Sequence, residues 1–108
     1  MSFISEGKRF ASGRTEPGTT SWVQYGDGVG IYVDVDTSAG RFTGIPVYTT
    51  SLGGNSSHWS TSGGTSVYDA TATGFRIYVK RVDGNPITPE YANQRKWHIN
   101  WTGVEIDE

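Results

Sequence analysis

Short runs in which apolar and polar residues alternate recur along this chain, and helical periodicity is nowhere sustained. In one run, Ile31, Val33 and Val35 alternate with polar residues. Because successive side chains of a β-strand point to opposite faces, this pattern is typical of a strand with one buried and one solvated face. The same alternation occurs over Phe75–Val79 and over Trp97–Trp101. The pattern therefore predicts an antiparallel, all-β fold.

Weaker runs predict four further strands, separated by turns rich in glycine, asparagine, aspartate and proline. These strands are expected over Phe3–Ala11, Ser21–Tyr25, Pro46–Leu52 and Thr65–Ala70. After Gly103 the apolar residues change parity, which predicts a β-bulge near that glycine. Thr88–Asn93 is the one segment that favours a helical turn, with Pro89 at its first position.

The number of predicted strands defines the architecture. Six or seven short strands at this spacing predict an antiparallel β-sandwich or barrel, and we expect the sandwich. A chain of 108 residues has room for one hydrophobic core, so residues 1–108 are expected to form a single domain. Hydrophobic residues make up only 34% of the chain and aromatic residues 13%. A few large aromatic side chains must therefore supply much of the buried area.

Composition and charge argue against several classes of function. The net charge is −2, with basic and acidic residues well mixed, so a nucleic-acid partner is not expected. No apolar stretch approaches the roughly 18 residues that span a bilayer, so membrane insertion is not expected either. The chain has no cysteine, and its first residues lack the features of a secretory signal. We therefore expect a protein that is cytoplasmic or released by a non-standard route.

Catalytic and metal-binding motifs are missing from the sequence. The two histidines, His58 and His98, are not part of any recognisable catalytic pattern. The segment that starts at Asp34 begins like a calcium loop, but Ala39 and Ile45 stand where an EF-hand requires Gly and Glu. We therefore expect no enzyme activity, no cofactor and no metal site.

Two loops carry the side chains that a sugar-binding site needs. Sugars present both C–H faces and hydroxyl groups, so their sites combine aromatic rings with charged and amide groups. In the first loop, His58 and Trp59 lie among glycines and serines, where the indole is either buried in the core or a contact surface. The second loop holds Arg81 and Asp83, which could equally form an ordinary solvated turn. Asp27, between two glycines, could bind hydroxyl groups or its own backbone.

The order of several segments resembles the H-type lectin family, known from snail agglutinins and from the C-terminal domain of discoidins. The resemblance spans most of the chain, and its motifs are mainly structural. It rests on Glu6-Gly7-Lys8 followed by Trp22, on Arg41–Val47, on Val67–Phe75 with its Gly-Phe strand restart, and on Trp97–Glu105. The resemblance implies a six-stranded antiparallel sandwich that assembles as a trimer and binds galactose or N-acetylgalactosamine.

The same resemblance implies a sugar site built from three groups. Asp27 matches the family's acidic residue in an early loop. The family's middle-strand arginine has no counterpart, since its position falls near Ser62, and the late Trp-His pair would fall near Val82 and Asp83. The pair His58-Trp59 and Arg81 would have to replace the missing groups in a rearranged site.

The resulting hypothesis is a multivalent lectin that binds glycans through Asp27, His58, Trp59, Arg81 and Asp83. Trimerisation would strengthen binding because linked sites act at a high effective concentration. The alternative is a structural or adhesin module of a trimeric fibre or phage-like receptor-binding protein, with the same sandwich and a protein partner. A small hydrolase ranks last.

Overall fold

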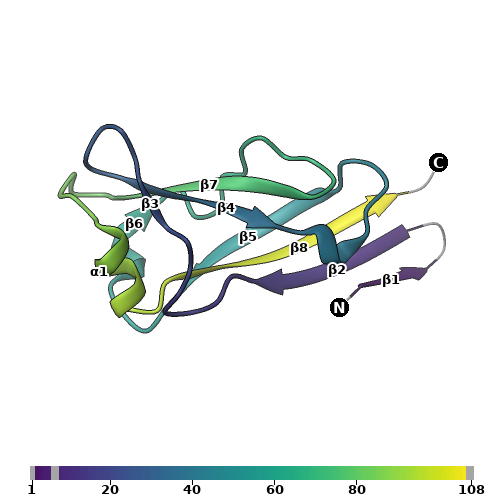
Figure 1. Cartoon of the computed structure of the whole chain (residues 1–108), viewed down its shortest axis with the longest axis horizontal. Helices are drawn as coiled ribbons and strands as arrows, with labels where there is room; N and C mark the ends of the chain where they lie inside the picture. Colours follow the sequence, from purple (N-terminus) through teal and green to yellow (C-terminus); the bar gives the residue numbers. More distant parts are fainter. Residues whose placement is uncertain (1, 6–7, 107–108) are drawn as a thin grey trace.

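The computed structural model describes residues 2–5 and 8–106. Its eight strands form two antiparallel four-stranded sheets, ordered β1-β2-β8-β5 and β3-β4-β7-β6. The strands are β1 (Ser2–Ser5), β2 (Lys8–Arg14), β3 (Val23–Gln24), β4 (Ile31–Asp36), β5 (Val47–Gly53), β6 (Thr61–Ser62), β7 (Gly74–Arg81) and β8 (His98–Ile106). Figure 1 shows the sheets as two layers, with the termini at one end and the short helix α1 (Pro89–Gln94) at the other. The predicted antiparallel all-β character is confirmed, in a sandwich-like arrangement.

The strand count exceeds the predicted six or seven for two reasons. The strand expected over Phe3–Ala11 is two strands, β1 and β2, that pair with each other as a hairpin; residues 6 and 7 lie outside the described part. Strand β6 has only two residues, too few for alternation to show. The strand expected over Thr65–Ala70 is wrong: this segment forms only an isolated bridge from Tyr68 to Arg76.

The core lies between the inner faces of the two sheets. Strands β4 and β7 both bury every second residue, as the alternation predicted. The aromatic rings carry the contact between layers, with Tyr48 of one sheet 4.6 Å from Phe75 of the other, centroid to centroid. The buried apolar side chains of the described residues are Ala11, Trp22, Ile31, Val33, Val35, Phe42, Tyr48, Phe75, Ile77, Val79, Ile87, Ala92, Trp97, Ile99 and Trp101.

The bulge predicted near Gly103 is wrong. Strand β8 keeps a continuous register with β2 on one side and with β5 on the other. Gly103 lies on the inward face of β8 with Ile99 and Trp101. The ring of Phe42 fills the space that a side chain would need there, since an added Cβ would lie 2.7 Å from the Phe42 Cζ. Glu105 also faces inward, so the change of parity reflects a carboxylate inside the sandwich, not an extra residue.

Hydrogen bonds compensate the burial of Glu105. Its carboxylate accepts bonds from the backbone N–H of Thr43 at 3.0 Å, from the Thr43 hydroxyl at 2.9 Å and from the N–H of Gly44. Such bonds favour the ionised carboxyl, and they lower the pKa of Glu105. The side chain thereby fixes the loop that precedes β5 against β8.

Acid is therefore expected to destabilise the protein through Glu105. A folded-state pKa below the ordinary value of 4.5 means that the stabilisation is complete above that value and is lost as the pH falls through the folded-state pKa. The melting temperature should thus decline steeply below about pH 4.5. Glu105→Gln should be less stable at pH 7 and show a shallower acid decline, measured by circular dichroism. Parallel pH profiles for both proteins would contradict this role.

The short helix α1 forms where one helical turn was predicted. Thr88 caps it by accepting a hydrogen bond from the N–H of Tyr91, 3.1 Å from the Thr88 Oγ1, and Pro89 stands at its start. The ring of Tyr91 meets that of Trp97 edge to face at 5.7 Å. Trp97 is fully buried, so α1 closes this end of the core.

Candidate functional site

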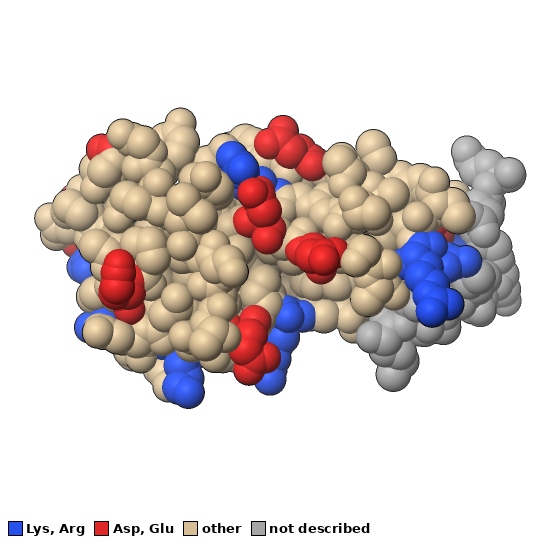
Figure 2. Space-filling view, viewed as in Figure 1, with Lys and Arg blue, Asp and Glu red and all other residues tan. Residues whose placement is uncertain are grey.

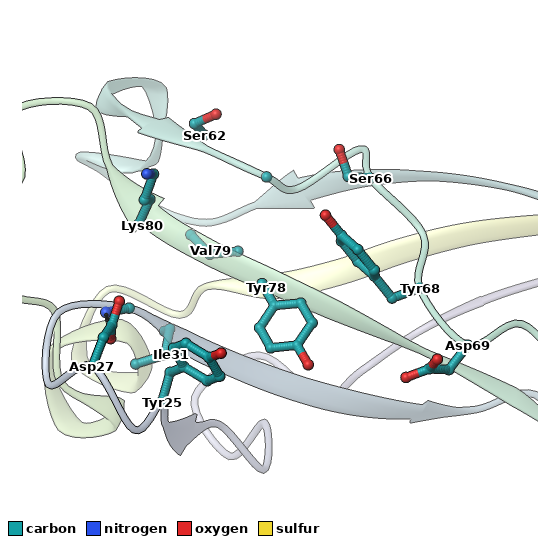
Figure 3. A pocket seen from close by; sticks show the side chains of 12 residues that line it. Tyr25, Asp27, Ile31, Ser62, Ser66, Tyr68, Asp69, Tyr78, Val79 and Lys80 are labelled. Carbon is teal, nitrogen blue, oxygen red and sulfur yellow. Dashed lines mark hydrogen bonds between the residues drawn. The ribbon is translucent and has the colours of Figure 1, made fainter.

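A cleft with a volume of about 670 Å³ lies on the outer face of the β3-β4-β7-β6 sheet. Strand β7 forms its floor, the turn between β3 and β4 forms one wall, and the segment from Ser62 to Asp69 forms the other (Figure 3). We call it the tyrosine cleft. It is lined by Tyr25, Asp27, Gly30, Ile31, Ser62, Gly63, Ser66, Tyr68, Asp69, Tyr78, Val79 and Lys80.

Three tyrosine rings follow one another through the cleft. Tyr78 lies between Tyr25 and Tyr68, with centroid distances of 5.4 Å and 5.1 Å and nearly perpendicular planes (Figure 3). Tyr78 points outward because its neighbours along β7, Ile77 and Val79, point into the core. Tyr25 and Tyr68 are about half exposed. The rings thus offer apolar faces and hydroxyl groups to solvent.

An ion pair links β4 and β7 on the outer face of the sheet, beside the tyrosines. The guanidinium of Arg76 donates two hydrogen bonds to the Asp34 carboxylate, from Nε at 2.7 Å and Nη2 at 2.9 Å. The same guanidinium lies over the Tyr32 ring, 4.1 Å from its centroid, a cation–π contact. The pair lowers the pKa of Asp34 and raises that of Arg76. These charges are therefore already neutralised within the protein.

Charged side chains differ between the two ends of the cleft. Asp27 and Lys80 lie at one end and Asp69 lies at the other (Figure 3). The Oδ1 of Asp27 accepts hydrogen bonds from the backbone N–H groups of Val29 at 2.8 Å and Gly30 at 3.0 Å. These bonds, with the nearby charge of Lys80, lower the pKa of Asp27. Asp27 therefore stabilises its own turn and also places an ionised carboxylate in the cleft.

Trp59 is presented to solvent by an ordered loop. It lies in the 3-10 turn His58–Ser60, and 88% of its surface is exposed. The loop is anchored by Trp97, whose Nε1 donates to the Ser56 carbonyl at 2.8 Å, and by the N–H of Asn55, which donates to the Arg95 carbonyl at 2.8 Å. Of the two roles left open for this indole, the buried one is wrong. The contact surface stays a prediction.

The remaining predicted residues lie outside the lining of the cleft. His58 is half-buried, and its Nδ1 has no hydrogen-bond partner among the described residues. Arg81 forms an ion pair with Asp83 at 3.2 Å, and Asp83 also accepts from the N–H of Asn85 at 2.9 Å. That geometry is the ordinary solvated turn considered above. Of the five predicted site residues, Asp27 alone lines the cleft.

The five residues nevertheless lie toward the same end of one sheet. Arg81 pairs with Thr61 across β7 and β6, and the N–H of Val82 donates to the Ser60 carbonyl at 2.9 Å. The loop that carries His58 and Trp59 therefore adjoins the end of β7, on the side of Lys80. The sequence therefore predicted residues at this end of the sheet, but it did not predict the tyrosines of the cleft. The available signal was the presence of Tyr32 and Tyr78 at the polar positions of two alternating strands.

The surface offers little support for other kinds of site. On the face shown in Figure 2, acidic and basic side chains are interspersed with uncharged surface and no continuous basic stripe appears. In the described part of the chain, no group of three or more His, Asp or Glu side chains is placed to hold a metal ion. No helix among the described residues has the length and apolar character needed to cross a membrane.

Comparison with known proteins gave no relative on which to base an assignment. No protein-family model matches the chain, and searches of curated proteins and of solved structures found no significant match.

Proposed function

We propose that this protein is a carbohydrate-binding module whose site is the tyrosine cleft. The observation that carries the proposal is the row of three outward-facing tyrosine rings, set among serine hydroxyls and ionised side chains. Rings of this kind stack on the C–H faces of sugars, while hydroxyl, carboxylate and ammonium groups bond to sugar hydroxyls. A cleft with apolar walls and a few convergent polar groups is the usual form of a ligand site.

Galactose- and N-acetylgalactosamine-containing glycans are the first ligands to test, because the H-type lectin resemblance implies them. The assembly as a trimer is part of the same proposal, since linked sites gain strength by avidity. Light scattering of the purified protein tests it. A trimeric mass supports multivalent binding, and a monomeric mass at all concentrations contradicts it.

The experiment on the site compares two single variants on a glycan array. Tyr68→Ala removes one half-exposed ring of the cleft and should lower the affinity for the bound glycan about tenfold or more, which corresponds to about 1.4 kcal/mol. Trp59→Ala removes a more exposed aromatic ring that lies outside the cleft lining, and binding should persist. Circular dichroism confirms that both variants are folded. Loss of binding in Trp59→Ala alone would instead place the site on the loop that the sequence first suggested.

A second candidate function has its own observation. Trp59 and Val82 are both large, exposed apolar side chains, and the hydrogen bond from Val82 to Ser60 brings their segments together. Exposed tryptophans are enriched at the centres of protein interfaces. An adhesin module with a protein partner would use this surface. It is favoured if the folded protein gives no signal on a broad glycan array.

A further inference from the structure

We infer that the tyrosine cleft binds several consecutive units of a neutral, linear oligosaccharide, and not a single terminal sugar. This inference rests on the proposed function and specifies its ligand class. It is carried by the extent of the cleft, by the order of its rings and by the distribution of charge along it.

A second hollow adjoins the end of the tyrosine cleft at which Asp69 lies. It has a volume of about 270 Å³, lies along the same strands and is lined by Asp34, Asp36, Thr73 and Arg76, among others. Asp69 lines both hollows, so they adjoin at this residue. Together they follow β7 from Lys80 to Gly74, a length of about 20 Å at ~3.3 Å per residue.

The volume of the first hollow alone is larger than one sugar ring requires. Its volume of about 670 Å³ falls within the roughly 300–1,000 Å³ of sites that hold drug-sized ligands. Such ligands are larger than a single hexose. The cleft therefore has room for more than one unit before the second hollow begins.

The three tyrosine rings are arranged one after another along the cleft, in the direction in which a bound oligosaccharide would extend. Tyr25 lies beside the turn that carries Asp27, because its N–H donates to the Gly30 carbonyl at 2.9 Å. Tyr68 lies toward the other end, where it bridges to Arg76. Tyr78 stands between them (Figure 3). Successive sugar rings would thus meet successive aromatic rings, with different polar groups at the two ends.

The charges favour a neutral chain over an acidic one. The first hollow is lined by two carboxylates, those of Asp27 and Asp69, and by one ammonium group, that of Lys80. In the second hollow the charge of Arg76 is already matched by Asp34, and Asp36 adds a further carboxylate. A ligand that carries a carboxylate on every unit would be repelled by this lining.

The test measures affinity against chain length by isothermal titration calorimetry. The probes are galacto-oligosaccharides and N-acetylchito-oligosaccharides from monosaccharide to hexasaccharide, with oligogalacturonates as the acidic series. One neutral series should bind about tenfold or more tightly at three or four units than at one, then level off, while the acidic series binds more weakly. A monosaccharide that binds as tightly as its oligomers, or a preference for the acidic series, would overturn the inference.

Asp69 provides the matched variant. Its φ of 55° is left-handed, a conformation that asparagine tolerates, so Asp69→Asn removes the charge without straining the backbone. It should weaken binding of the longer oligomers about fivefold or more and leave the shortest ones unchanged, whereas Asp83→Asn, in the turn outside the cleft, should alter neither. An equal effect of Asp69→Asn on all lengths contradicts a second subsite. Failure of every neutral glycan to bind overturns the proposed function itself.

Discussion

Trp97→Ala is expected to lower the free energy of unfolding by about 3–5 kcal/mol. The indole is fully buried, it stacks edge to face with Tyr91, and its Nε1 donates to the Ser56 carbonyl. Its own carbonyl accepts a hydrogen bond from the Trp22 Nε1 at 3.1 Å. The substitution leaves a large cavity where α1, the loop that carries Trp59 and the segment between β2 and β3 that carries Trp22 meet. Such a loss is a large share of the total stability of a small domain, about 5–15 kcal/mol.

The measurement is denaturant unfolding followed by circular dichroism, with Trp97→Phe as the control. Phenylalanine keeps an aromatic ring beside Tyr91 but removes the hydrogen bond to Ser56, so its cost should be clearly smaller than that of alanine. The melting temperature of Trp97→Ala should fall by more than about 10 °C. A loss of less than about 1 kcal/mol would be below the usual range for deletion of a core tryptophan, and it would show that this end of the core is not organised around Trp97.

Gly63→Ala is expected to weaken binding in the tyrosine cleft by about tenfold or more, equivalent to about 1.4 kcal/mol. Gly63 lies where one wall of the cleft runs along the edge of β7, just after Ser62 pairs with Lys80, and a Cβ there would collide with the backbone carbonyl oxygen of Tyr78. Its φ of 108° is also unfavourable for any residue with a side chain. Because neither the carbonyl nor its strand can move easily, the segment from Ser62 to Asp69 must shift away from Tyr78. The stack of Tyr68 on Tyr78 should be lost with it.

Gly84→Ala is the matched control for this variant. Gly84 also has a positive φ, 81°, but an added Cβ would meet nothing within 4 Å. Both variants therefore carry the strain of the left-handed backbone, and only Gly63→Ala adds the collision. We expect Gly63→Ala to lose glycan affinity by about tenfold or more, equivalent to about 1.4 kcal/mol, and Gly84→Ala to retain it. Equal affinities in the two variants would show that this wall does not shape the site.

The central strands could be predicted from the sequence because their burial is simple. In β4 and β7 the apolar residues alternate strictly with polar ones, and the structure buries the predicted set. The helical turn was equally visible, since Thr88 and Pro89 are typical of a helix start. The prediction of a bulge near Gly103 was wrong because the alternation of apolar and polar residues breaks down at Glu105. Glu105 faces inward through specific hydrogen bonds from a distant loop, and no local pattern reveals such a partner.

The candidate site was only partly predictable for the same reason. Tyr25, Tyr68 and Tyr78 come from three separate segments, and their approach depends on how the segment from Ser62 to Asp69 runs along the edge of β7. That segment has no alternation, and its one bridge joins Tyr68 to Arg76. Trp59 was easier to single out, because a tryptophan among serines and glycines is conspicuous in a sequence. Its exposure, and its position outside the cleft lining, required the structure.

Binding of a glycan in the tyrosine cleft is tested most directly by titration of the isotopically labelled protein with the best array ligand, followed by backbone amide chemical shifts in NMR. We expect progressive shifts that cluster at Tyr25, Tyr68, Tyr78 and Lys80, with the outer face of the β1-β2-β8-β5 sheet unchanged. Shifts confined to the loop around Trp59, or to that other sheet, would contradict binding in the cleft.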